Sequence, residues 1–323
     1  TKVYTDYDEF RWSKDAEFSQ YGVFGELTRE LGNERRLIGG VRVDRVSVTD
    51  ERAQLCNMMG KACRTNPTAD AERSDTLSSG FLRYEHALAS LPATAYIGLG
   101  HSQRFPDYWE LFSAANQVNK PTAYETVEPE KTTQLDVGLQ YRSGPLEAWV
   151  SAYAGEVKDY ILFTYGPGMN PLHTISEVSN VDARIAGAEL GGSYKLTENW
   201  KADASLAYAW GENTTDDRVM PQIPPLEARL GLSYERGNWS AAGLWRVVTA
   251  QSREAVWFDE TNRKRMDGNV TSKDFDESTG FGVLSLNAAY RVNEHFKLSA
   301  GVDNLLDKAY SEHLNQAGNA GVG

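Results

Sequence analysis

The chain has 323 residues and a formal net charge of −12, and 41% of its residues are hydrophobic. This hydrophobic share excludes a disordered composition, and the acidic balance argues against a nucleic-acid-binding surface. The sequence has no apolar run of about 18 residues, so it predicts no transmembrane helix. The polar start, TKVYTDYDEF, does not fit a signal peptide, and we expect the chain to begin in the middle of a protein.

Strict alternation of apolar and polar residues recurs along the chain. In 134–141, Leu135 and Val137 alternate with polar or small residues, and 146–154 and 296–303 follow the same rule. Period two over such lengths predicts β-strands. About twelve strands of roughly 12–20 residues are expected, longer than the roughly 5–6 residues usual in soluble sheets. The predicted strands start near residues 17, 34, 75, 92, 130, 145, 172, 199, 224, 238, 278 and 295.

The connections between the predicted strands alternate between short and long. The short ones are 32–35, 89–92, 143–145, 197–199, 236–238 and 293–295. The long ones are 50–74, 105–129, about 164–171, 212–223, 255–277 and the tail after 310. A meander with all tight turns at one end and all long loops at the other is the plan of an outer-membrane β-barrel, with periplasmic turns and extracellular loops.

Aromatic residues recur beside the short turns, at one depth in the predicted strands. They are Tyr141, Tyr194, Trp200, Tyr234, Trp239, Tyr290 and Phe296. Such a row is what the aromatic girdle at a membrane interface requires. A soluble up-and-down or sandwich protein would explain neither this depth nor the strand lengths. Polar residues expected to face the barrel lumen are Arg42, Asp44, Gln134, Asp136, Lys201, Asp203 and Asp303.

Five segments in chain order carry a resemblance to a known family. They are GHSQRFPDYWELFS (100–113), VEPEKTTQLDVGLQY (127–141), NVDARIAGAELGGSY (180–194), PQIPPLEARLGLSY (221–234) and GVDNLLDKAYSEHL (301–314). In this order they resemble the barrel signatures of TonB-dependent outer-membrane receptors. The run DNLLDKAYSEHLNQAGNAG is most similar to the copper-receptor branch of that family, of the OprC and NosA type.

The resemblance implies an all-β fold: the C-terminal portion of a transmembrane, antiparallel up-and-down β-barrel. We expect residues 1–323 to form one partial barrel domain of about twelve of the 22 strands. The plug domain, the TonB box and the final strand are expected to be missing from the sequence, and an open sheet should not transport by itself because its edges would be unpaired in lipid.

The function implied by the resemblance is active transport across the bacterial outer membrane, with no catalysed reaction and no cofactor. Copper is the cargo that the branch suggests. A ferric siderophore or other metal chelate is the first alternative, and a passive porin-like barrel is the second. The implied partners are TonB with its inner-membrane motor, the protein's own plug domain, and lipopolysaccharide or other outer-membrane lipid.

The only two cysteines, Cys56 and Cys63, lie on the long connection 50–74, at the end assigned as extracellular. That compartment is oxidising, and two cysteines on one loop there usually form a disulfide. A second hypothesis is a copper(I) trap built from the cysteines with Met58 and Met59, since thiolate and thioether ligands suit that ion. A catalytic thiol is a third hypothesis, but no base lies near in sequence.

The stretch RFPDYWELF (104–112) ends a predicted strand at the same end of the barrel. It brings together Arg104, Asp107, Tyr108, Trp109 and Glu110. One hypothesis is an anchor that holds the loop in place, as the family resemblance suggests. The other is a contact with the ligand or the plug.

Overall fold

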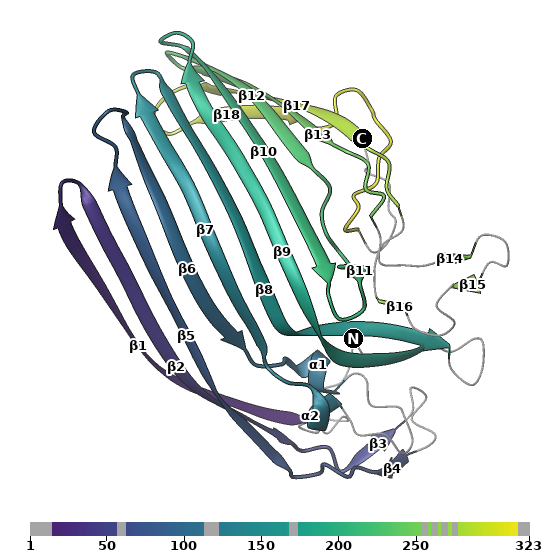
Figure 1. Cartoon of the computed structure of the whole chain (residues 1–323). Helices are drawn as coiled ribbons and strands as arrows, with labels where there is room; N and C mark the ends of the chain where they lie inside the picture. The colour runs from purple at the N-terminus through teal and green to yellow at the C-terminus, as the bar shows by residue number, and fades with distance from the viewer. Residues whose placement is uncertain are drawn as a thin grey trace.

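The computed structural model describes residues 15–56, 63–112, 123–167, 174–253, 258–259, 264–265, 271–272 and 277–315. Twelve strands form one continuous antiparallel path in chain order, as the alternation predicted. They are β1 (Ala16–Gly32), β2 (Arg35–Asp50), β5 (Glu72–Ala87), β6 (Ala93–Arg104), β7 (Glu130–Ser143), β8 (Leu146–Pro167), β9 (Thr174–Lys195), β10 (Trp200–Asn213), β12 (Glu227–Arg236), β13 (Trp239–Val248), β17 (Phe281–Arg291) and β18 (Lys297–Val302). Figure 1 shows the path as a single curved wall, which confirms the antiparallel barrel fold.

The remaining elements lie in the long connections. They are β3 (Gln54–Cys56), β4 (Cys63–Thr65), α1 (Tyr108–Phe112), α2 (Ala123–Thr126), β11 (Arg218–Val219), β14 (Phe258–Asp259), β15 (Lys264–Arg265) and β16 (Thr271–Ser272). β11 pairs with β10 and β16 with β8, which makes the sheet 14-stranded. No helix in the described ranges is both long and apolar enough to span a bilayer.

The predicted strand lengths are partly wrong. β12 and β13 have ten residues each and β18 has six, whereas β8 and β9 have 22. β8 and β9 are long because the hairpin continues beyond the wall after an irregularity between Val157 and Tyr160, where Asp159 takes a φ of 58°. In Figure 1 the ribbon bends away from the wall at the long-loop end. The bulge inserts one extra residue into β8 and shifts its alternation of faces, and residues 160–163 are apolar at every position, so sequence periodicity does not mark the point where the strand leaves the wall.

The tight turns lie along one rim of the wall and the long connections along the other (Figure 1). Gly144 and Gly237 have φ values of 52° and 57° in two of these turns, a conformation that glycine adopts without steric cost. Next to the turns, Trp200 lies opposite Tyr234 with ring centroids 4.8 Å apart. Trp239 lies opposite Tyr290 at 4.6 Å. The two pairs place four of the seven predicted aromatic residues beside the tight turns, and the other three, Tyr141, Tyr194 and Phe296, lie within two residues of the turn ends of β7, β9 and β18.

Burial is concentrated at the long-loop rim, where loops cover the wall. Val48 and Val127 are completely buried, and Leu111 is 1% exposed. One cluster joins Val48 of β2 to Leu111 and Phe112 of α1 and to Tyr124 of α2. Elsewhere the wall is a single layer, so apolar side chains of the middle strands stay exposed to their surroundings.

Candidate functional site

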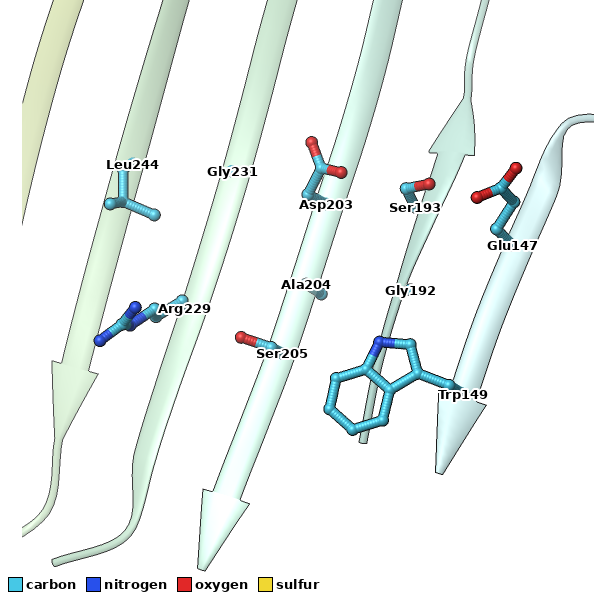
Figure 2. Close-up of a pocket in the computed structure, with 10 residues that line it drawn as sticks. All are labelled: Glu147, Trp149, Gly192, Ser193, Asp203, Ala204, Ser205, Arg229, Gly231 and Leu244. Atoms are coloured by element: carbon cyan, nitrogen blue, oxygen red, sulfur yellow. The ribbon is translucent and has the colours of Figure 1, made fainter. Parts of the chain in front are cut away.

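The strand register separates the wall into an apolar face and a polar face. Leu135 and Val137 lie on the apolar face of β7, and Gln134 and Asp136 lie on the opposite face. We call the polar face the lumen face, because outer-membrane barrels are apolar outside and polar inside. Figure 2 shows part of it, spanning β8 to β13.

Many charges on the lumen face are paired within their own strand. Residues two apart share a face of a strand, so a cation and an anion at that spacing meet side by side. The closest atoms are 2.6 Å apart in Arg42–Asp44, 2.7 Å in Arg83–Glu85, 2.8 Å in Lys201–Asp203 and 2.6 Å in Arg229–Glu227. Gln134 likewise donates to Asp136 at 2.8 Å. The wall is therefore polar and wettable, with much of its charge compensated.

A hollow of about 360 Å³ lies on this face. In Figure 2, Trp149 and Glu147 of β8 border one side and Arg229 of β12 the other. Small residues such as Ser193 and Ser205 lie between them. No group of three or more histidine, cysteine, aspartate or glutamate side chains within the described residues could hold a metal ion. The lining of the hollow combines the charged side chains of Glu147, Asp203 and Arg229 with the ring of Trp149 and the side chain of Leu244.

The segment Arg104–Phe112 is held by a network of charged hydrogen bonds. Arg104 donates to both carboxylate oxygens of Glu110 at 2.8 Å and to Glu130 at 2.7 Å. Asp107 Oδ1 accepts from the Glu110 amide at 2.9 Å, and Glu110 Oε2 accepts from the Asp107 amide at 2.7 Å. This reciprocal arrangement is a capping box at the start of α1. Arg104 and Asp107 are therefore engaged within the loop.

Two tyrosines fix α1 and α2 to the wall. Tyr108 donates to Asp15 at 2.9 Å, and burial, followed by the Asp15 carboxylate, raises the pKa of Tyr108. The Tyr124 hydroxyl lies 2.6 Å from the Ala71 carbonyl oxygen and 3.0 Å from that of Val48. Burial is also the main cause that raises the pKa of Tyr124. Trp109 contrasts with both, because it is 67% exposed.

The base of the cysteine-bearing hairpin is held by Asp50, which is completely buried. Its carboxylate accepts from Arg52 Nε and Nη2, both at 2.9 Å, from Asn66 at 2.9 Å and from Thr68 at 2.7 Å. The Arg52 guanidinium also lies 4.4 Å from the centroid of Phe112 in α1. Asp50 thereby joins the hairpin to the neighbouring loop.

The hairpin itself consists of β3 and β4, which place Cys56 opposite Cys63. Cys63 is exposed and disulfide-bonded. Met58 and Met59, the other members of the hypothetical copper trap, lie outside the described residues.

The structure thus distributes the predicted site residues over two places on the long-loop rim. Arg104, Asp107 and Tyr108 come together with Glu110 and Glu130 around α1, and Cys63 lies on the β3–β4 hairpin. Sequence reasoning singled out Glu110 without a role and missed Glu130 and the buried Asp50. The D-x-x-E spacing of Asp107 and Glu110 could have indicated the capping box. Nothing local marks Asp50, because its partners lie up to 18 residues away.

Comparison with known families decides what kind of barrel this wall belongs to. Residues 1–305 match the family model described as "TonB dependent receptor-like, beta-barrel". The chain belongs to the TonB-dependent receptor family. The motifs 100–113, 127–141, 180–194 and 221–234 all lie within the matched residues.

Individual TonB-dependent receptors differ widely in their similarity to the chain. The solved structure "Copper transporter OprC" is 57% identical to the chain, with a TM-score of 0.88. The match covers 100% of this chain and 49% of the OprC chain. The "Ferric-pyoverdine 358 receptor" of Pseudomonas putida is 23% identical over 67% of the chain and 25% of its own length. The "Catecholate siderophore receptor Fiu" of Escherichia coli K12 is 22% identical over 92% of the chain and 39% of its own length. The chain therefore spans half or less of each of these proteins.

Proposed function

We propose that the chain forms the barrel wall of an outer-membrane TonB-dependent receptor that actively takes up copper. The observation that supports copper is the 57% identity to the copper transporter OprC over the whole chain, at a TM-score of 0.88. The siderophore receptors reach only 22–23% identity, a level at which we use them as support for the fold alone. The chain acts as a transport wall and not as an enzyme.

The proposed partners follow from the family membership. TonB, energised by its inner-membrane motor, would act through a TonB box and a plug domain that occupies the lumen. The polar lumen face, with its hollow beside Trp149, offers a surface on which such a domain can rest. The apolar face with its aromatic row fits outer-membrane lipid and lipopolysaccharide, so we place the protein in the bacterial outer membrane.

The test is metal accumulation in bacteria that lack their own copper receptor and carry the full-length protein. Copper uptake above that of receptor-free cells, lost when TonB is deleted, is the expected result. Copper uptake that equals the receptor-free level, together with uptake of a ferric catecholate or pyoverdine, would replace copper by the siderophore alternative. TonB-independent entry of small solutes would favour the porin-like alternative.

For the hairpin we propose a Cys56–Cys63 disulfide that shapes the loop. The support is that Cys63 is disulfide-bonded, that Cys56 lies opposite it, and that the chain has no other cysteine. Closing so short a loop should contribute about 2–3 kcal/mol. Copper(I) is titrated into the intact receptor and into a Cys56→Ser, Cys63→Ser double variant. Equal affinity supports the disulfide role, whereas a large loss in the variant supports the metal trap with Met58 and Met59.

For the segment 104–112 we propose that Arg104, Asp107 and Tyr108 anchor the loop and that Trp109 contacts the cargo or the plug. The anchor is supported by the hydrogen bonds around Glu110, and the contact by the exposure of the indole. Trp109→Ala should reduce transport without loosening the loop. Tyr108→Phe is the matched variant. It keeps the ring but removes the hydroxyl that donates to Asp15, so its main effect should be to loosen the loop.

A further inference from the structure

Four aromatic side chains of β5 to β9 lie on the lumen face between the tight turns and the irregularity at Val157, and each faces a glycine. The register pairs are Phe81 with Gly40, Tyr96 with Gly138, Tyr153 with Gly187, and Trp149 with Gly191. Between the tight turns and that irregularity, they are all the aromatic residues that the alternation assigns to that face of these strands, whereas beyond it Tyr160 of β8 faces Val181. A glycine opposite every one of them is a pattern that calls for a physical reason.

The reason is space. A Cβ added to Gly138 or to Gly187 would lie 2.5 Å from the hydroxyl oxygen of the opposite tyrosine. At Gly40 it would lie 2.7 Å from Phe81 Cε1, and at Gly191 it would lie 3.0 Å from Trp149 Cζ2. The rings therefore lie flat across the glycine backbones instead of standing up from the wall. None of the four glycines has a positive φ, so backbone conformation does not require glycine there.

Flat rings keep this part of the lumen face low. The neighbouring residues on the same face include the short Ser151, Ser193 and Ser205, and the guanidinium of Arg83 lies over the Tyr96 ring, 3.9 Å from its centroid. Figure 2 shows the indole of Trp149 reaching from β8 toward the strand that carries Gly192, at the edge of the hollow. Four large side chains are thus present on this wall without occupying the bore.

We propose that Gly40, Gly138, Gly187 and Gly191 are positioning residues for transport: they hold the four rings against the wall and keep the lumen free for whatever moves through it. The inference rests on the proposed function, because it assumes a receptor whose lumen must admit a moving plug or cargo. A methyl group at Gly138 would push Tyr96 off the wall, since the sheet backbone closes the other side.

A purely structural role makes different predictions. Aromatic rings that cover glycines also stabilise sheets. In that case the ring stabilises the sheet, and its removal would destabilise the receptor whether the opposite residue is glycine or alanine. If the ring matters because of where it lies, removing it should relieve the damage that a methyl group at the glycine causes.

The first experiment compares copper uptake by full-length receptors at equal amounts of folded protein. Gly138→Ala should slow uptake about tenfold, the effect of a barrier increase of about 1.4 kcal/mol. Gly100→Ala is the matched control, because Gly100 lies on the lumen face of β6, as Tyr96 does, and a Cβ added there meets nothing within 4 Å. The Tyr96→Ala, Gly138→Ala double variant should recover the wild-type rate. A double variant as slow as Gly138→Ala, or a Gly138→Ala receptor as fast as Gly100→Ala, overturns the proposal.

The second experiment does not depend on the cargo. A crystal structure of the full-length Gly138→Ala receptor should show the Tyr96 ring projecting into the lumen while β6 and β7 keep their register. A ring still flat on the wall, with the two strands moved apart, overturns the proposal. Absence of copper uptake by the wild-type receptor would refute the proposed function, and the position of the ring would still decide the inference.

Discussion

The two rims of the wall are built from the same strands but are held in different ways. At the tight-turn rim the sheet is one layer thick, and its contacts are between neighbouring strands, such as the Trp200–Tyr234 pair. At the long-loop rim, α1 and α2 pack against Val48 of the wall, and the β3–β4 hairpin is joined to β2 through Asp50, a polar residue at 0% exposure. Buried polar groups are costly when unpaired, so single substitutions should be far more damaging at the long-loop rim.

The ion pairs of two arginines illustrate the difference. The side chain of Arg142, at the tight-turn rim, is 79% exposed and lies 3.1 Å from Glu147. Arg104, at the other rim, contacts two carboxylates whose side chains are 10% and 14% exposed. An exposed ion pair contributes little because water and salt screen it. A substitution series across both rims therefore tests the contrast directly.

Asp50→Asn should have the largest effect. It keeps the shape of the side chain but leaves Arg52 without its charge partner, so we expect the β3–β4 hairpin to lose about 3 kcal/mol of protection against local opening. Amide hydrogen exchange at Gln54–Cys56 and Cys63–Thr65 measures this. Asp303→Asn, at an exposed position beyond β18, is the control and should leave exchange unchanged. Equal exchange in both variants would show that Asp50 does not hold the hairpin.

Arg104→Ala should rank second. It leaves Glu110 and Glu130 facing each other without a cation, and we expect α1 to lose about 2 kcal/mol of protection. Arg142→Ala should change stability by less than about 0.5 kcal/mol, since exposed ion pairs contribute little. Hydrogen exchange at Tyr108–Phe112 measures the loss of protection in Arg104→Ala. Urea unfolding of the lipid-embedded receptor compares the stability of both variants. A loss at Arg142 as large as that at Arg104 would remove the contrast between the rims.

Tyr124→Phe should cost about 1 kcal/mol, the net contribution of one hydrogen bond. It deletes the hydroxyl that lies near the Val48 and Ala71 carbonyl oxygens while keeping the ring that stacks on Phe112 at 5.6 Å. The measurement is the exchange rate of the Val127 amide, which directly follows α2 and donates to the carbonyl oxygen of Ala123, the first residue of that helix. Tyr208→Phe, on the half-exposed apolar face of β10, is the control. An unchanged rate in Tyr124→Phe would assign the docking of α2 to packing alone.

The aromatic pair at the tight-turn rim should show the smallest effect. A double-mutant cycle on Trp200→Leu and Tyr234→Leu should give a coupling of about 0.5–1 kcal/mol. Urea unfolding in lipid vesicles measures each corner of the cycle. The cycle on Trp239 and Tyr290, whose ring centroids are 4.6 Å apart, should give a similar value. Coupling near zero in both would mean that the row of rings acts on the lipid and not across the strands.

The strands, their order and the two rims could be predicted from the sequence because they depend on local rules. Alternation at residues 134–141 marks β7, and the short connection 143–145 brings β7 and β8 together as an antiparallel pair. The aromatic row follows from the same spacing, since equal distances from tight turns give equal depths. TonB-dependent receptor membership also came from local motifs, which are read without knowledge of distant contacts.

Only the tertiary structure decided which polar residues do more than face water. Asp50 accepts hydrogen bonds from Asn66 and Thr68, which follow the far strand of the hairpin. Arg104 donates a hydrogen bond to Glu130 at the start of the next strand of the wall. The glycines beneath the rings are likewise defined by cross-strand register, because Gly138 is 42 residues away from the Tyr96 that covers it. Local periodicity fixes the face on which a side chain lies. Which neighbour it meets depends on how distant segments pair, and no local pattern contains that information.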